Sequence, residues 1–262
     1  MALHRVVRAP LERFYTGRLR SHVRRGGVPG HVAVILDGNR RWAESVGLRA
    51  GDGHRRGADK VDDLLDWCGQ LGIGEVTLWA LSGENLTRPG PELTALLDVV
   101  ADKLDALTER AGSPGHAMRI RVFGRFDGFP ARLQEAIRRA EAQTAGNGGV
   151  RLNIALGYSG RDELVDACKA MIASLAAEGV PASELPDRVT SDALAAHLYT
   201  AGRPDPDLIV RTSGELRLSG FLPWQSAHSE FYFTDVYWPA FRELDFLRAL
   251  RTYQQRERRY GR

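Results

Sequence analysis

The sequence is poor in cysteine and in long apolar runs. Its 262 residues include two cysteines, Cys68 and Cys168, which lie far apart and without the spacing of a metal site. Isolated cysteines of this kind are typical of reducing compartments, so we expect two buried free thiols, no disulfide and a cytoplasmic protein. No apolar run approaches the roughly 20 residues that a membrane-spanning helix needs. No apolar segment follows the N-terminal arginines, which argues against a secretory signal.

Lysine is scarce as well. Only three of the 36 lysines and arginines are lysines, and the formal net charge is +3. A basic balance favours anionic partners, which include nucleic acid, membrane surfaces and phosphate groups. The sequence also lacks repeats and low-complexity tracts, and with 43% apolar and 26% charged residues it is typical of a globular protein.

The first 28 residues form a basic arm. Residues 1–27 hold seven arginines and one acidic residue, Glu12. Several apolar or long side chains in this arm are spaced as on one face of a helix. They are Leu11, Phe14, Tyr15, Arg18 and Leu19. Such a helix either packs on the body of the protein or makes a peripheral membrane contact. Nucleic-acid binding by the arm has no other support in the sequence, so we expect no nucleic-acid partner.

From residue 29 onward, short apolar runs alternate with helical patterns. The predicted strands cover residues 31–36, 75–81, 118–123, 150–156, 207–210 and 231–233. The predicted helices cover residues 58–70, 89–110, 131–144, 161–177, 191–198 and 244–259, with a linker over 179–190. Continuous apolar strands that alternate with helices indicate a parallel sheet covered on both faces. We therefore expect one α/β domain over residues 29–262, with a mainly parallel central sheet of about six strands and helices on both faces.

Unusual polar residues follow four of the predicted strands. Parallel strands all end at one edge of a sheet, where ligands of such sheets bind, so we expect these residues to meet there. They are Asp37-Gly38-Asn39-Arg40-Arg41-Trp42, Ser82-Gly83-Glu84-Asn85 with Arg88, Gly157-Tyr158-Ser159-Gly160-Arg161, and Arg211-Thr212-Ser213-Gly214-Glu215 with Arg217, Leu218 and Ser219. Any one of them is explained equally well as a surface charge, a turn or a helix cap. Their coincidence on one edge is the argument for a site.

Arginines dominate this predicted edge. Guanidinium groups bind phosphate oxygens in a bidentate manner, and glycine turns present backbone N–H groups to anions. The phosphate-binding candidates fall into two sets. One set is Arg40, Arg41, Arg49 and His54, and the other is Arg211, Arg217 and Ser219. Two sets predict two phosphate-bearing ligands.

Asp37 is the exception in this basic group. A carboxylate that faces a diphosphate repels it unless a divalent cation lies between them. Mg²⁺ typically takes one or two carboxylates together with substrate phosphates, so we predict that Asp37 is a magnesium ligand. The alternative is a turn residue before Gly38. Gly51, Gly53 and Gly57 resemble the glycine fingerprint of dinucleotide-binding sites, but the spacing from Gly53 to Gly57 is one residue too long and the segment does not directly follow a strand. A dinucleotide site is therefore disfavoured.

Three segments resemble the signatures of the cis-prenyltransferases, a family that includes undecaprenyl diphosphate synthase. They are His31–Ala43, Leu81–Pro89 and Asp207–Glu215, the last followed by Arg217, Ser219, Phe221, Trp224, Gln225 and Glu230. The segment Arg258-Arg259-Tyr260-Gly261 resembles the family's C-terminal ending. The resemblance implies a magnesium-dependent transferase of isoprenoid biosynthesis. Such an enzyme condenses isopentenyl diphosphate with an allylic diphosphate, sets a cis double bond and releases diphosphate.

The resemblance also implies roles for individual residues. Asp37 and Asn85 would be catalytic: Asp37 would bind Mg²⁺ with Glu230, and Asn85, with Ser82 nearby, would support proton removal. The allylic diphosphate would lie on Gly38, Asn39, Arg40, Arg41 and His54. Isopentenyl diphosphate would lie on Arg211, Arg217 and Ser219. The adjoining substrate-binding positions are Trp42, Ser82, Gly83, Glu84, Arg88 and Leu218. Family members are usually homodimers, so we expect a homodimer whose interface includes segments near Glu230 and the C-terminus.

A few positions depart from the family pattern. Ala50 stands where many members have an arginine, which leaves the role of Arg49 open. Leu81 and Leu86 stand where long-chain members commonly have bulky aromatics. In this respect the sequence resembles short-chain actinobacterial Z-farnesyl diphosphate synthases. Pro223 and His228 depart from the commoner Leu and Tyr. We therefore expect a short product such as (2Z,6E)-farnesyl diphosphate, made from geranyl diphosphate.

Two alternatives remain within the family. One is a long-chain synthase of the carrier lipid for cell-wall glycans. The other is a non-catalytic partner subunit, which the presence of the acidic and basic site residues disfavours.

The growing prenyl chain needs an apolar tunnel. One helix face is apolar enough to line such a tunnel, although it is equally explained as ordinary hydrophobic core. This face comprises Leu93, Leu96, Leu97, Val100, Leu104 and Leu107.

Overall fold

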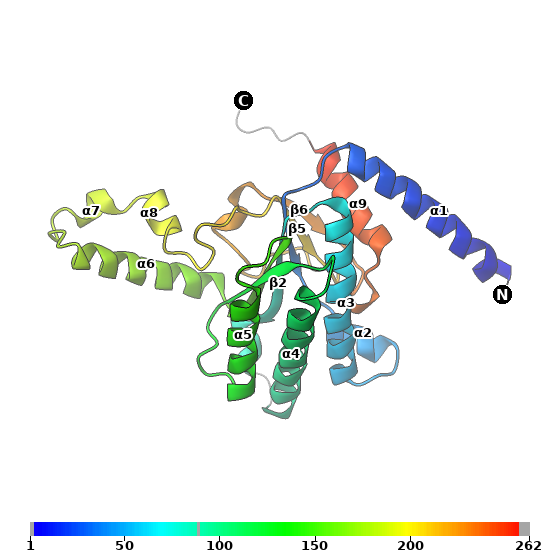
Figure 1. Cartoon of the computed structure of the whole chain (residues 1–262), viewed down its shortest axis with the longest axis horizontal. Helices are drawn as coiled ribbons and strands as arrows, with labels where there is room; N and C mark the ends of the chain where they lie inside the picture. The colour runs from blue at the N-terminus through cyan, green and yellow to red at the C-terminus, as the bar shows by residue number, and fades with distance from the viewer. Residues whose placement is uncertain (1–2, 88–89, 257–262) are drawn as a thin grey trace.

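The computed structural model describes residues 3–87 and 90–256, with side chains from residue 12 onward. Arg88 and the predicted C-terminal signature, 258–261, lie outside the described residues. Figure 1 shows a central sheet with α-helices packed against it, and two helical projections that extend away from the body in opposite directions.

The strands form one parallel sheet in the order β3-β4-β2-β1-β5-β6. Their bounds are β1 (His31–Ile35), β2 (Glu75–Ser82), β3 (Met118–Phe123), β4 (Val150–Tyr158), β5 (Leu208–Arg211) and β6 (Glu230–Phe233). All six predicted strands are present, with ends within two residues of the prediction. The predicted α/β fold with a central parallel sheet is confirmed.

Among the helices, the one predicted to start at residue 58 begins at Ala50, two are additional, and the others lie close to the prediction. Their bounds are α1 (Leu3–Arg25), α2 (Asn39–Ser45), α3 (Ala50–Leu71), α4 (Gly90–Ala111), α5 (Ala131–Thr144), α6 (Gly160–Ala177), α7 (Leu185–Arg188), α8 (Ser191–Ala195) and α9 (Glu243–Gln255), with 3-10 helices η1 (Gly83–Thr87), η2 (Gln225–His228) and η3 (Trp238–Ala240). Helix α2 was not among the predicted helices. Gly38 has φ +98°, and this left-handed conformation turns the chain from β1 directly into α2. Helix α7 is a single turn in the predicted linker.

The two faces of the sheet are buried by different parts of the chain. Alternate strand residues point to opposite faces, as Val32 and Val34 do relative to Ala33 and Ile35. The first face packs on the apolar sides of α3, α4, α5 and α9, which makes the larger core. The second face packs on residues of the segment after β5, above all Phe221, whose ring stacks on Trp79 of β2.

The N-terminal arm is a helix that joins the same core only near its end. Leu19 and Val23 of α1 are buried there, and α1 contacts α9. Arg20 forms an ion pair with Glu243 of α9 at 2.5 Å, whereas Phe14 is 69% exposed. Figure 1 shows the first part of α1 extending away from the body. The division into an arm and a domain over residues 29–262 stays a prediction.

The two cysteines differ. Cys68 is a buried free thiol on α3, as expected. Cys168 is also free but is exposed, so its predicted burial was wrong. It lies on α6, which projects from the sheet together with α7 and α8 and buries little of its surface (Figure 1). No helix of the described residues is long and apolar enough to cross a membrane.

Two glycines allow α3 to approach the start of α2 very closely. A Cβ atom on Gly53 would lie 2.2 Å from the backbone oxygen of Asn39, and one on Gly57 would lie 2.2 Å from the Asn39 Oδ1. These separations are far below van der Waals contact. A larger residue at position 53 must push α2 and α3 apart because it meets backbone, whereas one at position 57 displaces the Asn39 side chain. The contact matters because α2 carries Arg40 and Arg41, two of the predicted phosphate-binding residues.

Gly53→Ala should therefore lower the free energy of unfolding by about 1–3 kcal/mol, since overpacking a tight contact carries that cost. Gly69→Ala is the matched control on the same helix, because nothing lies within 4 Å of a Cβ at that position. The control should raise the stability by about 0.5–1 kcal/mol. Urea denaturation of both variants checks the pair, and equal effects would contradict the close-packing interpretation.

Candidate active site

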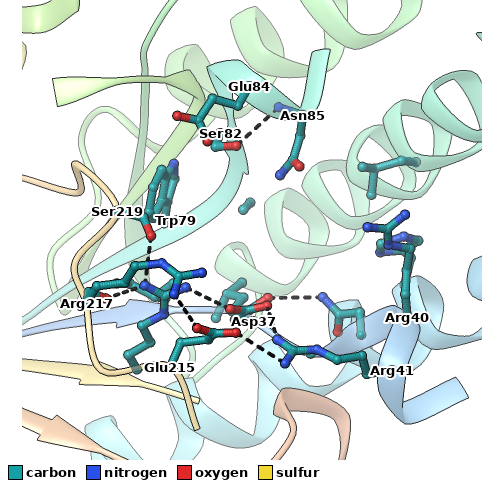
Figure 2. Close-up of a pocket in the computed structure, with 18 residues that line it drawn as sticks. Asp37, Arg40, Arg41, Trp79, Ser82, Glu84, Asn85, Glu215, Arg217 and Ser219 are labelled. Atoms are coloured by element: carbon teal, nitrogen blue, oxygen red, sulfur yellow. Dashed lines mark hydrogen bonds and ion pairs between the residues drawn. The ribbon is translucent and has the colours of Figure 1, made fainter. Parts of the chain in front are cut away.

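A polar pocket of about 450 Å³ lies at the edge of the sheet where β1, β2 and β5 end. Figure 2 shows its side chains converging from these strands and from the adjoining α2 and η1. Residues from all these segments line it. They are Ile35, Leu36, Asp37, Gly38, Asn39, Arg40, Arg41, His54, Trp79, Ala80, Ser82, Glu84, Asn85, Leu96, Arg211, Glu215, Arg217 and Ser219. Three of the four groups predicted to meet at this edge thus do so in the structure.

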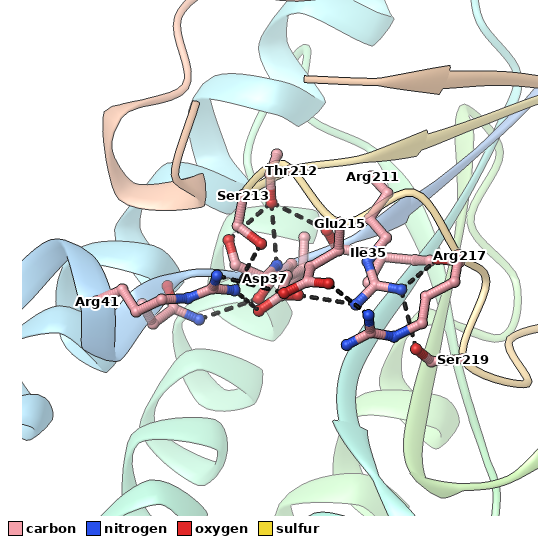
Figure 3. Close-up of polar contacts among 11 residues, drawn as sticks. Ile35, Asp37, Arg41, Arg211, Thr212, Ser213, Glu215, Arg217 and Ser219 are labelled. Carbon is pink, nitrogen blue, oxygen red and sulfur yellow. Dashed lines mark hydrogen bonds and ion pairs between the residues drawn. The ribbon is translucent and has the colours of Figure 1, made fainter. Parts of the chain in front are cut away.

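Asp37 is fixed at the centre of the polar group. Its backbone N–H donates to the Thr212 Oγ1 at 3.0 Å, and this hydroxyl donates to the Asp37 carbonyl oxygen at 2.8 Å. Its carboxylate accepts from Arg211 Nη2 at 3.0 Å and from Arg41 Nη2 at 3.3 Å (Figure 3). These contacts tie the ends of β1 and β5 together and aim one carboxylate into the pocket.

The arginines keep Asp37 ionised. Burial opposes ionisation, but hydrogen bonds with Arg211 and Ser213 and the charges of Arg211 and Arg41 outweigh it. The pKa of Asp37 therefore lies below its ordinary value. A negative charge fixed at this position is the property that a metal ligand or a charge-orienting residue needs.

Arg211 is a buried arginine with several anchors. It is 5% exposed, and besides Asp37 its guanidinium donates to the Ser219 Oγ at 2.9 Å and to the backbone carbonyl of Arg217. The loop between these residues bends sharply, because Ser213 has φ +78° and Ser219 has φ +51°. Such values are uncommon outside glycine and mark a backbone held by its surroundings. Arg211 therefore shapes the loop that carries Arg217 and Ser219.

Glu215 links the two predicted arginine sets. Its carboxylate lies 2.6 Å from Arg217 Nη1 and 3.4 Å from Arg41 Nη1. Figure 3 shows it between these two guanidinium groups. The pocket therefore has four arginines against three carboxylates, Asp37, Glu84 and Glu215, and is less positive than the sequence suggested. Its arginines are largely neutralised by protein groups.

The end of β2 supplies the opposite wall. The backbone N–H of Asn85 donates to the Ser82 Oγ at 3.2 Å, which holds the start of η1 over the strand. Figure 2 shows Ser82, Glu84 and Asn85 across the pocket from Asp37. An amide in this position can orient a neutral part of a ligand whose charged part lies on the arginines.

An apolar cavity of about 70 Å³ continues from the polar pocket between the sheet, α3 and α4. The two share Leu36, Asn39, His54, Ala80 and Leu96. Four of the six residues predicted as a tunnel face line this cavity, namely Leu96, Val100, Leu104 and Leu107. Leu93 and Leu97 do not line it and pack in or against the core. A ligand with a charged head and an apolar tail fits this pair of spaces.

Some predicted site residues lie elsewhere. Trp42, Gly83 and Leu218 do not line the pocket, and Arg88 is outside the described residues. The segment after β4 is also absent from the lining; its Tyr158 is buried and donates to Glu163 at 2.6 Å. Leu81 is buried in the core and Leu86 packs against it, so neither lines the apolar cavity.

Glu230 is separated from Asp37 within the chain. It is the first residue of β6 and is in register with Leu208, whereas Phe233 is in register with Arg211 at the pocket edge. Glu230 therefore lies about three residues, or roughly 10 Å, down the strand from that edge. Its carboxylate forms an ion pair with Arg256. No group of three or more potential metal-ligating side chains occurs among the described residues.

Several lining residues were not predicted to bind substrate. Glu215 lies inside the third signature segment, and its position two residues from Arg217 was the available signal. Trp79 and Leu36 are apolar strand residues that sequence patterns assign to the core. Only the geometry of the sheet edge shows that they also face the pocket.

Comparison with known proteins identifies the family. The model of a family described as putative undecaprenyl diphosphate synthase matches residues 35–261. The chain belongs to this prenyltransferase family. The resemblance of the three signature segments is thereby confirmed, and the protein is a transferase enzyme.

Relatives within the prenyltransferase family match along nearly the whole chain. An isoprenyl transferase of Thermus thermophilus is 49% identical over 253 residues, covering 97% of this chain and 96% of the relative. A (2Z,6E)-farnesyl diphosphate synthase of Thermobifida fusca is 48% identical over 257 residues, covering 98% of this chain and 99% of the relative. Among solved structures, lavandulyl diphosphate synthase from Lavandula x intermedia in complex with dimethylallyl diphosphate has a TM-score of 0.84 and 36% identity, covering 90% of this chain and 99% of that chain.

The contacts of Asp37 predict a pH-dependent effect on stability. Asp37→Asn should lower the free energy of unfolding by about 1–2 kcal/mol at neutral pH, because the buried Arg211 loses its charged partner. A depressed folded-state pKa contributes stability above the unfolded value, and this contribution is lost as pH falls through the folded value. The difference between wild type and variant should therefore shrink as pH falls below the ordinary value of 3.8.

Urea denaturation at a series of pH values measures this difference. Asp187→Asn on α7 is the control, because Asp187 is an exposed carboxylate for which the structure gives no ion pair. It should show little effect at any pH. A constant difference for Asp37→Asn across the pH range would mean that its carboxylate is not held ionised by the arginines.

Proposed function

We propose that this prenyltransferase adds isopentenyl diphosphate to geranyl diphosphate and releases a short cis product such as (2Z,6E)-farnesyl diphosphate. One observation carries the proposal: two sets of arginines flank Asp37 at the mouth of an apolar cavity. The charged groups suit two diphosphates and the cavity suits one prenyl tail.

Each substrate has a natural position. Arg40, Arg41, Asn39 and His54 lie beside the entrance to the apolar cavity, so the allylic diphosphate belongs there with its tail inside. Isopentenyl diphosphate, which has only a short tail, belongs on Arg217 and Ser219. The lavandulyl diphosphate synthase complex, which contains an allylic diphosphate, supports a prenyl diphosphate substrate class for this fold.

The reaction needs stabilisation of the leaving group. Breaking the allylic C–O bond leaves a carbocation and places negative charge on the departing diphosphate, which Arg40 and Arg41 are positioned to stabilise. The isopentenyl double bond then attacks the allylic carbocation and forms the new C–C bond. The adjacent carbon of the isopentenyl unit loses a proton to an oxygen of the departing diphosphate, and the C–H electron pair forms the cis double bond. Asn85, on the opposite wall, would orient the isopentenyl unit for this proton loss.

The lining fits a requirement for Mg²⁺. Four guanidinium groups already matched by three carboxylates leave little positive charge for two diphosphates, and Asp37 would repel them. A magnesium ion held by Asp37 and substrate phosphates would neutralise charge on the leaving diphosphate. Glu230 does not face the pocket in the single chain, so Asp37 carries this proposal.

The short product rests on the size of the apolar cavity. Its volume of about 70 Å³ is well below the roughly 300–1,000 Å³ typical of pockets for drug-sized ligands, so even a short prenyl tail requires the cavity to widen. A long polyprenyl chain would require α3 and α4 to separate widely. The Thermobifida fusca relative named for a farnesyl product supports the same length. Leu81 and Leu86, whose identity predicted a short product, do not line the cavity and can influence it only through packing. Cytoplasmic location, a homodimer and membrane contact by the arm remain further parts of the proposal.

Product analysis tests the function directly. Purified protein, Mg²⁺ and labelled isopentenyl diphosphate should convert geranyl diphosphate into a product with one added unit, and chelation of the metal should stop turnover. The dephosphorylated products are separated by chain length. A ladder of long polyprenols from farnesyl diphosphate would instead establish the long-chain alternative.

Asp37→Ala should lower kcat about a thousandfold, because it removes the charge that organises the leaving group. Its circular dichroism should match that of wild type. Near-native turnover in a folded variant would remove Asp37 from the proposed chemistry.

Arg217→Ala should raise the apparent KM for isopentenyl diphosphate about tenfold with a smaller change in kcat, as expected for lost ground-state binding. Arg217 is the better probe because Arg211 is buried and also holds Asp37. Leu216→Ala, at the 79% exposed neighbour in the same loop, is the control and should leave both constants unchanged. An unchanged KM in Arg217→Ala would place this substrate elsewhere.

A further inference from the structure

Helices α3 and α4 form one side of the apolar cavity and lead away from the polar pocket together. Both begin near the pocket edge, and they pack against each other (Figure 1). Residues with higher numbers on either helix therefore lie farther from the polar pocket. The deepest residues that line the cavity on these helices are Val61 of α3 and Lys103, Leu104 and Leu107 of α4.

At this depth four charged residues join the two helices. They are Asp62 and Asp66 of α3 with Lys103 and Arg110 of α4, here called the α3–α4 clamp. Lys103 pairs with Asp62. Arg110 donates to Asp62 at 2.9 Å and also pairs with Asp66. The clamp thus spans about two turns of α4, at and just below the end of the apolar lining.

The cations of the clamp are unusually buried for a surface ion pair. The side chain of Lys103 is 14% exposed and that of Arg110 is 19% exposed, and the Arg110 Nε is buried without a hydrogen-bond partner. Asp62 and Asp66 are more exposed, at 38% and 45%. The cationic side chains therefore reach inward from the seam between the helices, while the carboxylates face outward.

A second cavity, of about 370 Å³, lies beyond the clamp. Leu65 and Gly69 of α3, Met118 of β3 and Val150 of β4 help to line it, and so do Asp66 and Arg110 of the clamp itself. It shares no lining residue with the apolar cavity. Arg110 therefore stands between an apolar space continuous with the active site and a larger space at the far end of the same helices.

We propose that the α3–α4 clamp is the stop that limits the length of the prenyl product. This inference rests on the proposed function, because it assumes that the growing tail enters the apolar cavity. A lengthening apolar chain that reaches Lys103 and Arg110 must either displace half-buried charges from their partners or remain short. The ion pairs also resist separation of α3 from α4, which would be needed to join the two cavities.

The experiment compares the products of wild type and clamp variants, with geranyl diphosphate, isopentenyl diphosphate and Mg²⁺. Arg110→Ala removes both the charge and the bulk, and Lys103→Met removes a charge while keeping an unbranched side chain of similar length. Both should raise the ratio of longer to wild-type product by about tenfold, the lower end of the discrimination that an apolar pocket gives against one methylene group of substrate. Melting temperatures establish that each variant is folded.

Arg139→Ala is the matched control. Arg139 of α5 pairs with Asp105 of α4, so it is also an interhelical ion pair on α4, but neither residue lines either cavity. Its product distribution should equal that of wild type. If it lengthens the product as much as Arg110→Ala does, general loosening of α4 accounts for the effect and the clamp proposal is wrong.

The remaining outcomes separate the two proposals. An unchanged product in folded Arg110→Ala and Lys103→Met, with a single short product from wild type, overturns the clamp and leaves the proposed function standing. A long ladder from wild type itself overturns both the short-product function and the stop. No turnover of these substrates by wild type overturns the proposed function before any variant is compared.

Discussion

Arg211 is almost fully buried at the end of a central strand, and a buried guanidinium must be paired. Asp37 provides that partner from the adjacent strand, and its backbone is held at the same time by Thr212. Arg211 also donates to Ser219 and to the carbonyl of Arg217, so one buried charge determines both the position of the Asp37 carboxylate and the course of the neighbouring loop. The two halves of the proposed substrate site are therefore not independent, since changes to either member of this pair alter both.

The same pairing creates a conflict that the substrates must resolve. Asp37 and Glu215 pair with the guanidinium groups of Arg41 and Arg217, which are the groups proposed to bind the diphosphates. In the proposed function, a bound diphosphate therefore exchanges one anionic partner of these arginines for another. Arg211 is different, because its own side chain is buried and it holds the neighbouring loop, so it remains a structural arginine. This division of roles explains why residues of one sequence motif should respond differently to substitution.

The predictable part of the structure is the part fixed by local pattern. Apolar runs gave the strands within two residues, and the rule that parallel strands end at one edge brought Asp37, Ser82 and Arg211 together correctly. Helix α2 was missed because its polar sequence resembled a loop and its start depends on the conformation of Gly38. The separation of Glu230 from the pocket depends on the register of β6, which no local pattern encodes. The exposure of Cys168 depends on how α6 projects from the sheet, and this arrangement is also not encoded in the local sequence pattern.

Product length is the property least accessible to sequence reasoning, for a physical reason. In the proposed function, chain growth is limited by the residues that close the space between α3, α4 and the sheet, and the pairs proposed to close it lie about forty positions apart, as Asp62 and Lys103 do. A motif beside the catalytic residues, such as Leu81 and Leu86, acts on this space only through packing. In the proposed function, the diphosphate is recognised by short sequence motifs at the sheet edge, whereas the length of the prenyl chain is limited by contacts between helices. Two members of the family can therefore share every motif of the polar pocket and still differ in the product they release.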